Sequence, residues 1–166
     1  MQLIPIESTD DHYKTCKLWL EDREITKWLT SVLRYSKYPR MMHEMLISTR
    51  KNRLFFISVQ NKRVGLVGLI NIDRVDKRAE IFCFVGSQSH QNKGIATQAL
   101  NRMKKLAVVE LKLHTLYGHL VESNAASVRL MEKIGFQNIG KYRKAFFIDG
   151  TFKDMLAVDW VREEGI

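Results

Sequence analysis

The chain has 166 residues, of which 45% are hydrophobic, and 27 Lys and Arg against 18 Asp and Glu give it a formal charge of +9. This length suits one buried core, so we expect a single domain over residues 1–166. No apolar run approaches the ~20 residues that cross a bilayer, and the N-terminus lacks a signal-peptide pattern, so we expect a cytoplasmic protein without a membrane partner. The charge favours an anionic partner, but basic residues are spread from Lys14 to Arg162, which argues against nucleic acid. Cys16 and Cys83 lack CxxC or Cys/His spacing, which argues against a metal site or a disulfide framework.

The first 72 residues predict a strand, helices and a strand pair. Residues 3–6 resemble a short edge strand, because Pro5 has no N–H to donate to a ladder. Ser8, Thr9 and Asp10 are candidate caps for the first of two or three helices within residues 10–50. Residues 54–59 and 64–72 are rich in β-branched and aromatic side chains, and the polar segment 60–63 separates them. This pattern predicts an antiparallel pair.

The remaining elements alternate between strand and helix. Residues 79–86 are apolar on both faces apart from Glu80, which predicts a central strand covered on both sides. Apolar residues at helical spacing predict an amphipathic helix from near Lys93 to Ala107, and residues 114–121 predict another strand. A second helix should begin near Asn124 and end at Gly135, and Asp149-Gly150 should form a hairpin turn. The sum is a mixed α/β sheet with helices on both faces.

The junction between the strand at 79–86 and the next helix carries the strongest chemical signal. Free backbone N–H groups at a helix N-terminus attract an anion such as a pyrophosphate. Within the loop, Gly94 permits close approach of the backbone, Ala96 adds little bulk, Lys93 brings a charge and Thr97 a hydroxyl. The pattern Gln-x-x-Gly-x-Ala lacks the glycines of a P-loop or of a dinucleotide fold, which disfavours ATP and NAD.

Two segments together resemble the GNAT family of N-acetyltransferases. The first is the loop Gln91-Asn92-Lys93-Gly94-Ile95-Ala96, and the second runs from Val121 through Asn124 and Ser127 to Gly135-Phe136. The second segment is most similar to the branch that includes the ribosomal-protein N-terminal acetyltransferases. The resemblance implies a mixed, mostly antiparallel central sheet flanked by helices on both faces, and an enzyme that uses acetyl-CoA, without a metal, to acetylate a primary amine. Family habit also allows a homodimer, which the residues themselves do not decide.

The resemblance also implies which residues bind acetyl-CoA. The loop would hold the pyrophosphate, the backbone of the preceding strand would meet the pantetheine arm, and the Val85 N–H would stabilise the oxyanion. Asn124 and Ser127 would bind the other side of the pantetheine. Arg129 and Lys133 could meet phosphate, pair with local acids or stay solvated. The predicted cofactor-binding set is therefore Phe84, Val85, Gly86, Gln91, Asn92, Lys93, Gly94, Ile95, Ala96, Thr97, Asn124, Ser127 and Arg129.

Glu80 is the first candidate for the general base that deprotonates the amine. It stands on an otherwise apolar strand, where burial would raise its pKa, and eleven residues before Gln91, as does the base of histone-acetylating members. The alternative is a structural pair of Glu80 with Arg78 or Lys77. His90 and His119 are rival bases, because histidine titrates near neutrality. Tyr117 and Tyr142 could donate a proton or serve only in packing.

One position departs from the family pattern. Many members carry a tyrosine seven residues after the asparagine as the general acid, and here that residue is Met131. Because a thiol has a pKa near ~8.5, the thiolate is a tolerable leaving group without that acid. The departure leaves open an alternative function, a catalytically degenerate CoA-binding sensor or interaction module.

The acceptor is a small-molecule amine or a protein N-terminus. Its cleft should have one wall from the N-terminal helices, where the aromatic and methionine side chains are more often core than ligand contacts. A basic protein suits a polyamine only if a local acidic pocket, such as Glu21, Asp22 and Glu24, overrides the net charge. The residues considered for the wall are Trp19, Trp28, Tyr35, Tyr38, Met41, Met42 and Met45.

Overall fold

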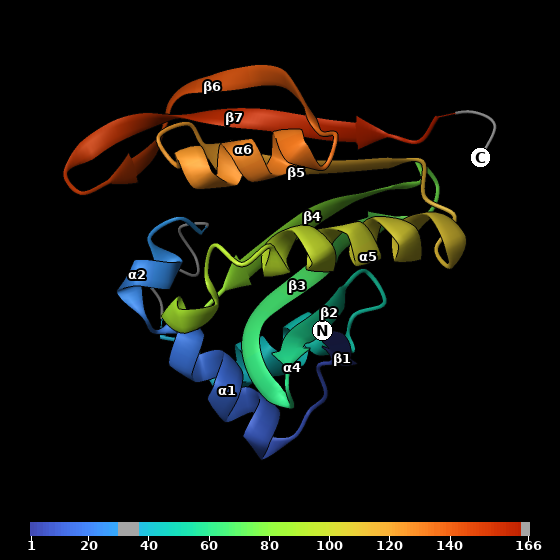
Figure 1. The fold of residues 1–166 in the computed structure, drawn as a ribbon, viewed down its shortest axis with the longest axis vertical. Coiled ribbons are helices and arrows are strands. Elements are labelled where there is room, and N and C mark those ends of the chain that lie inside the picture. Colours follow the sequence, from blue (N-terminus) through green and yellow to red (C-terminus); the bar gives the residue numbers. More distant parts are fainter. Residues whose placement is uncertain (30–36, 164–166) are drawn as a thin grey trace.

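The computed structural model describes residues 1–29 and 37–163 and arranges them as a central sheet between two layers of helices (Figure 1). None of the helices in these two ranges is long and apolar enough to cross a bilayer. The elements follow in the order β1 (Gln2–Pro5), α1 (Asp10–Leu20), α2 (Arg23–Thr26), α4 (Arg40–Ser48), β2 (Arg53–Val59), β3 (Lys62–Asp73), β4 (Arg78–Val85), the 3-10 turn η1 (Gln88–His90), α5 (Ile95–Val109), β5 (Thr115–Val121), α6 (Ala125–Lys133), β6 (Gln137–Ile148) and β7 (Thr151–Val161).

The described strands form one sheet in the order β1-β2-β3-β4-β5-β7-β6. Neighbouring strands are antiparallel except β4 and β5, which run parallel. Parallel neighbours require a crossover, which α5 provides between β4 and β5. The predicted mixed, mostly antiparallel sheet is therefore confirmed, and β1 is the edge strand that Pro5 indicated.

Local sequence signals act where they were expected. Thr9 caps α1, because its hydroxyl accepts a hydrogen bond from the His12 N–H at 3.2 Å. Gly135 has φ +88° after α6, and the Phe136 N–H returns to the Met131 carbonyl at 3.0 Å, which is a left-handed helix ending. Asp149 and Gly150 both have positive φ and join β6 to β7 in a two-residue turn.

Three element boundaries differ from the prediction. The loop at 60–63 is a two-residue turn of Gln60 and Asn61, both with positive φ, so Lys62 and Arg63 already belong to β3. Helix α5 begins at Ile95 instead of near Lys93, because Gly94 has the left-handed φ of +72°. Strands β6 and β7 are far longer than the hairpin predicted around Asp149-Gly150, since they extend from Gln137 to Val161.

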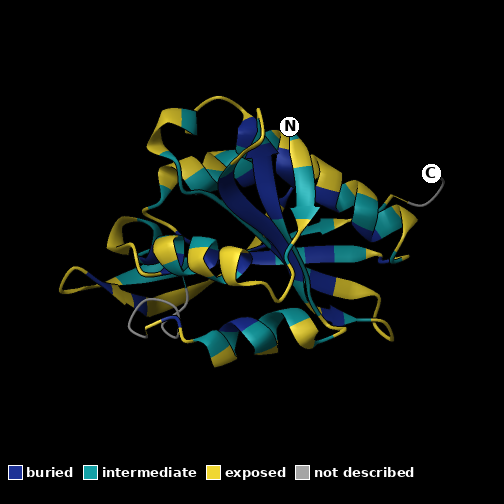
Figure 2. Cartoon of the chain, turned by 90° about the horizontal axis from the view of Figure 1, so that it is seen from below, coloured by how far each residue is buried: buried dark blue, intermediate teal, exposed yellow. Residues whose placement is uncertain are grey.

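The two faces of the sheet carry separate hydrophobic clusters. Helices α5 and α6 cover one face, where Leu100 and Met103 are almost fully buried with the side chains of β3 and Ile81. Helix α1 and Tyr38 cover the other face over Phe56 and the aromatic side chains of β4. Figure 2 shows the buried residues along the sheet and the exposed residues on the outer sides of the helices. Alternation along β4 therefore divides its side chains between two environments.

Strands β4 and β5 are paired over only part of their length. The register runs from Arg78–Thr115 to Glu80–Tyr117, and beyond that point the two strands diverge, as the ribbon shows (Figure 1). The rest of β4, residues 81–85, is paired on its other side with β3. This divergence opens the middle of the sheet directly beside Glu80.

Candidate functional site

The loop before α5 has the geometry of an anion site. Gly94 has φ +72°, and a β-carbon built on it would meet no atom within 4 Å, so its backbone faces open space. Asn92 also has positive φ, and both Asn92 and Lys93 are exposed. The Gln91 side chain donates a hydrogen bond to the Val85 carbonyl at 3.1 Å, which ties the loop to the end of β4.

The first turn of α5 supplies the donors. The first backbone hydrogen bond of this turn is Gln98 N–H to the Gly94 carbonyl at 3.1 Å, and no side chain caps the helix. The N–H groups of Ile95, Ala96 and Thr97 therefore have no intrahelical partner, and the dipole of this 15-residue helix adds to their positive potential. These residues, with the open backbone at Gly94, fit a pyrophosphate.

The predicted pantetheine contacts lie on both sides of the diverging strands. Phe84 and Val85 form the end of β4, and Gly86 packs so closely under Trp19 that a β-carbon there would lie 2.9 Å from the indole. Across the opening, Asn124 caps α6, because its Oδ1 accepts a hydrogen bond from the Ser127 N–H at 3.2 Å. The fold thus brings the two sequence segments to the two sides of one opening.

The two basic residues considered for a phosphate contact both lie on α6. Arg129 and Lys133 are both exposed on this helix. Neither makes an ion pair with the acidic side chains of the described residues within 4.0 Å. A phosphate contact by Arg129 stays a prediction, and its position alone favours neither alternative.

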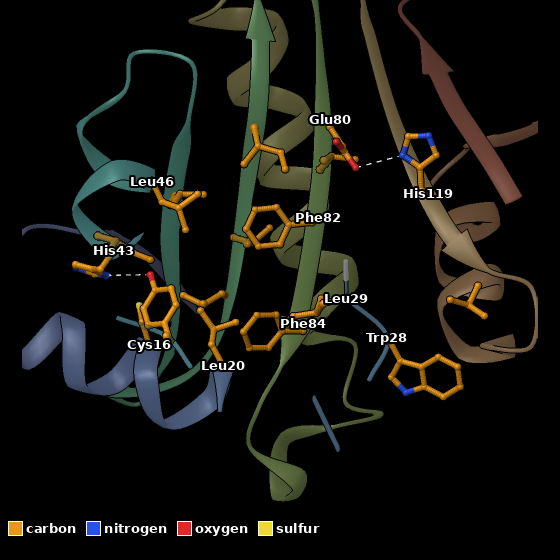
Figure 3. A pocket seen from close by; sticks show the side chains of 18 of the residues that line it. Cys16, Leu20, Trp28, Leu29, His43, Leu46, Glu80, Phe82, Phe84 and His119 are labelled. Carbon is orange, nitrogen blue, oxygen red and sulfur yellow. Dashed lines mark hydrogen bonds and ion pairs between the residues drawn. The ribbon is translucent and has the colours of Figure 1, made fainter. Parts of the chain in front are cut away.

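A cavity of about 460 Å³ lies on the face of the sheet opposite α5 (Figure 3). Glu80, Phe82 and Phe84 point into it from β4, since alternate residues of a strand share a face. The other walls come from the N-terminal helical region and from β2, β3, β5, β6 and β7. Besides the β4 residues, its lining includes Cys16, Leu20, Trp28, Leu29, Tyr38, His43, Leu46, His119, Val121, Tyr142, Phe146 and Met155.

The predicted N-terminal wall is only partly correct. Trp28 and Tyr38 line the cavity, but Trp19 packs against Gly86 and Phe84 instead. Met41 and Met45 are 70% and 65% exposed on the outer side of α4. Met42 belongs to the cluster under α1, and Tyr35 lies outside the described residues.

Glu80 stands at one end of this cavity within a hydrogen-bonded group. Its two carboxylate oxygens accept from Asn71 Nδ2 at 3.2 Å and contact His119 Nδ1 at 3.3 Å. The side chains of Glu80 and His119 are 21% and 32% exposed, so both are accessible but partly desolvated. Because an ionised carboxylate only accepts hydrogen bonds, this contact places a proton on Nδ1 and leaves Nε2 of a neutral imidazole as an acceptor.

The alternative structural pairing of Glu80 with Arg78 or Lys77 is absent from the described contacts. Arg78 pairs with Asp76 at 3.4 Å, whereas Glu80 contacts Asn71 and His119. The prediction that β4 is covered on both faces is also wrong at this end, because the face that carries Glu80 and Phe82 lines the cavity. The carboxylate therefore lies where an acceptor amine could reach it.

The remaining proton-transfer candidates differ in position. His90 lies in η1, where its Nδ1 is 2.8 Å from the Ser87 hydroxyl, and it does not line the cavity. The ring of Tyr142 is 5.9 Å from that of His119 and does line it. Burial and the Glu80 charge raise the pKa of Tyr117, which weakens it as a proton donor near neutrality. Met131 is buried in the core under β5, 6% exposed.

Sequence reasoning missed Asn71 as a member of this group. It lies at a register irregularity between Ile70 and Asp73 of β3 and has φ +53°, a conformation that asparagine tolerates better than most residues. Such bulges redirect side chains, often beside functional sites. An isolated asparagine inside an apolar strand pattern was the available signal.

The two cysteines are buried or partly buried and are not paired in a disulfide. Burial raises the pKa values of both Cys16 and Cys83 to about 12, so both thiols are neutral at physiological pH. Within residues 1–29 and 37–163, no three His, Cys, Asp or Glu side chains are grouped so that they could hold a metal ion.

Comparison with known proteins identifies relatives that are acetyltransferases. The family model described as an acetyltransferase (GNAT) domain matches residues 1–137. The spermidine N(1)-acetyltransferase of Escherichia coli K12 is 29% identical over 115 residues, which are 69% of this chain and 61% of that protein. A putative ribosomal N-acetyltransferase of Bacillus subtilis is 29% identical over 100 residues, which are 60% of this chain and 54% of that protein. Each match therefore spans less than two thirds of the relative's length.

A solved structure extends the likeness over nearly the whole chain. The spermidine N-acetyltransferase of Vibrio cholerae, crystallised with CoA and spermine, is 25% identical and superposes with a TM-score of 0.86. The match covers 96% of this chain and 94% of that one.

Proposed function

The chain belongs to the GNAT family of acetyltransferases, and we propose that it transfers an acetyl group from acetyl-CoA directly to a primary amine. One observation carries the proposal. The open N-terminus of α5 and the diverging strands β4 and β5 lead to Glu80 and His119, which border the cavity on the opposite face of the sheet. A cosubstrate path and an acceptor cavity thus meet at one pair of titratable side chains, as direct transfer in a ternary complex requires.

The chain's own residues suit each part of the cosubstrate. The N–H groups of the first turn of α5 and the backbone at Gly94 would hold the pyrophosphate, with Lys93 adding positive charge. The end of β4 would bind the pantetheine amides, and Asn124 and Ser127 would border it from α6. Acetyl-CoA supplies the activated thioester. The Val85 N–H stays the proposed donor to the developing oxyanion.

Glu80 is the proposed base, and its contact with His119 supports a role for both side chains in proton transfer. An ammonium ion must lose a proton before it can attack, and a positioned base accelerates such a step. Nε2 of neutral His119 can accept that proton, while Glu80 holds the ring through Nδ1 and stabilises the resulting imidazolium. Alternatively Glu80 accepts the proton itself. Asn71 fixes the carboxylate in either case.

The other half of the reaction needs no covalent enzyme intermediate. Cys83 faces the α5 side of β4 and has a pKa raised by burial to about 12, so its thiolate is scarce near neutrality. Met131, buried in the core, does not supply a proton to the leaving thiolate. Tyr142 lines the cavity near His119 and is the remaining side-chain candidate for that role.

The test measures two properties of three variants: acetyl-CoA binding by titration and turnover by thiol-release kinetics. We expect Glu80→Gln and His119→Asn each to lower kcat/KM by roughly 10²–10⁴-fold and to flatten its dependence on pH, because each removes a partner in proton transfer. CoA affinity should stay unchanged. His114→Asn is the matched control, because it makes the same replacement at an exposed histidine that does not line the cavity. Wild-type CoA binding without turnover of any amine would favour the non-catalytic CoA-binding module.

Two finer points remain proposals. A dodecameric structure of the Vibrio cholerae spermidine N-acetyltransferase, 24% identical to this chain, shares its fold. The homodimer that family habit allows stays a proposal, and light scattering measures the oligomeric state. We also retain the cytoplasm as the expected location, because acetyl-CoA, the proposed cosubstrate, is available there.

A further inference from the structure

The acceptor cavity is polar at one end and apolar elsewhere. Glu80, His119 and Tyr142 form the polar end, where the first two are hydrogen-bonded and the rings of the last two lie 5.9 Å apart. Phe82 and Phe84 form the floor, and Trp28 and Leu29 stand across from Leu20, as Figure 3 shows. An ammonium group therefore has one favourable place in the cavity.

Carboxylates are scarce around this cavity. Glu80 is the one carboxylate among the described residues that line it. Of the acidic residues on the neighbouring helices, Glu21 lies 3.6 Å from Lys17, Glu24 pairs with Lys27, and Asp22 caps α2. Residues 30–36, which read TSVLRYS, contain no acidic residue. The acidic pocket that a polycation would need is therefore not provided by these residues.

The other polar residues of the lining are already engaged. His43 Nδ1 lies 3.2 Å from the Tyr38 hydroxyl, and His43 Nε2 lies 3.2 Å from the Glu7 carbonyl. His43 is fully buried and Tyr38 is 3% exposed. Cys16, 2% exposed, keeps a neutral thiol. These groups present ring faces and sulfur to the cavity, so a second ammonium placed against them would lose its hydration without gaining a partner.

The volume sets the size of the acceptor. A cavity of about 150 Å³ lined by apolar side chains is enough to hold benzene. The present cavity, at about 460 Å³, has room for a one- or two-ring body and the short chain that carries its amine. It also falls within the range of small-molecule sites, roughly 300–1,000 Å³.

We infer that the acceptor is a small primary amine with one positive charge and an aromatic or branched apolar body, and that polyamines are poor acceptors. The inference rests on the proposed acetyltransferase function and concerns the acceptor side of the same site. In the inferred complex, the ammonium group of the acceptor lies at Glu80 and His119, and its apolar body covers Phe82 and Phe84. The inferred acceptor differs from spermidine, the substrate of the Escherichia coli and Vibrio cholerae acetyltransferases that this chain resembles.

The test measures thiol release from acetyl-CoA with 2-phenylethylamine, tryptamine, hexylamine, spermidine and spermine, and with the peptide Phe-Gly-Gly. We expect kcat/KM for the arylalkylamines to exceed that for spermidine by roughly 100-fold, since an apolar pocket rewards apolar bulk and leaves extra charges unpaired. If Phe-Gly-Gly exceeds the free arylalkylamines, the acceptor is a protein N-terminus and the small-molecule inference is wrong.

Two variants and a control separate specificity from folding. Trp28→Ala should lower kcat/KM for tryptamine by roughly tenfold and leave spermidine nearly unchanged, because it removes apolar wall and no charge. Leu29→Asp adds a second carboxylate to the cavity, so it should reduce the ratio of kcat/KM for the arylalkylamines to kcat/KM for spermidine. Phe152→Ala, at a 64% exposed ring outside the lining, is the matched control and should leave the selectivity unchanged.

The outcomes distinguish the two proposals. Spermidine turnover equal to or above that of every arylalkylamine overturns the inference and leaves the acetyltransferase function intact. CoA binding with no turnover of any apolar amine also counts against the inference. Absence of CoA binding by the folded protein refutes the proposed function itself.

Discussion

Replacement of Gly94 by glutamate tests the proposed pyrophosphate site at its most exposed backbone position. A β-carbon there meets nothing within 4 Å, so the new side chain causes no steric clash inside the protein. Its carboxylate would instead stand in the space reserved for a phosphate. At about 5 Å and an effective dielectric constant between about 20 and 80, one pair of like charges costs roughly 1–3 kcal/mol. CoA affinity should therefore fall by roughly 5- to 150-fold for each phosphate charge that the carboxylate faces.

The backbone cost of this change can be measured separately. Gly94 has φ +72°, where a residue with a β-carbon loses about 1–2 kcal/mol. Gly150, in the β6–β7 turn, has φ +75° and likewise no atom near its β-carbon position, so Gly150→Glu introduces the same charge and comparable strain outside the loop. Both variants should melt roughly 2–8 °C below the wild type, given the size of the chain.

Calorimetric titration with CoA decides the matter. The expected result is weakened binding by Gly94→Glu and wild-type binding by Gly150→Glu, with similar thermal melts. If Gly94→Glu binds CoA as tightly as the wild type, the pyrophosphate does not lie at this loop. Equal loss of binding in both variants would show that strain or global charge, and not the loop, controls affinity.

Three further changes address the covalent route, the α6 cap and the response to pH. Cys83→Ala should keep its turnover, and an acetylated protein in mass spectrometry that disappears in this variant would contradict direct transfer. Asn124→Ala should lower the free energy of unfolding by about 1 kcal/mol through loss of the cap, while Asn124→Asp keeps an acceptor and should lose less; chemical denaturation measures both. Burial lowers the pKa of His12 below 6.5, and its Nδ1 accepts from the Glu7 N–H at 3.0 Å, so the unfolded chain binds the proton first. The stability that neutral His12 provides is present above pH 6.5 and is lost as the pH falls toward its folded pKa. His12→Asn keeps a hydrogen-bond acceptor but does not titrate, so the melting temperature of this variant should fall less on the acid side. An identical dependence of melting temperature on pH in the two proteins would refute the assignment.

Short-range patterns in the sequence determined the parts of the protein that depend on neighbouring residues. The loop from Gln91 to Thr97 could be predicted as an anion site because its donors are consecutive amides at one helix N-terminus. The cap at Thr9 and the turn at Asp149-Gly150 are equally local. The two family segments, read in order, also indicated the sheet that the structure confirms.

Segments without a regular pattern of buried residues could not be predicted from the sequence in this way. Strand β6 is exposed along residues 137–145, and its first buried side chain is Phe146, so the polar segment QNIGKYRKA shows no alternation to read. The turn at Gln60–Asn61 was predicted too long, because neither residue is the glycine that usually marks two positive φ angles. In both cases pairing with a neighbouring strand overrides a weak local preference.

How the residues of the acceptor side are arranged was decided by the tertiary structure. Glu80 and His119 are 39 positions apart, and they meet because β4 and β5 are parallel neighbours joined through α5. Asn71 reaches the same carboxylate from an irregularity in β3. The cavity wall draws on residues from Ile6 to Met155, and whether it offers one carboxylate or several depends on which side chains the fold turns inward. Composition and spacing identify the residue types, but only chain packing sets the distances between atoms on which proton transfer and acceptor choice depend.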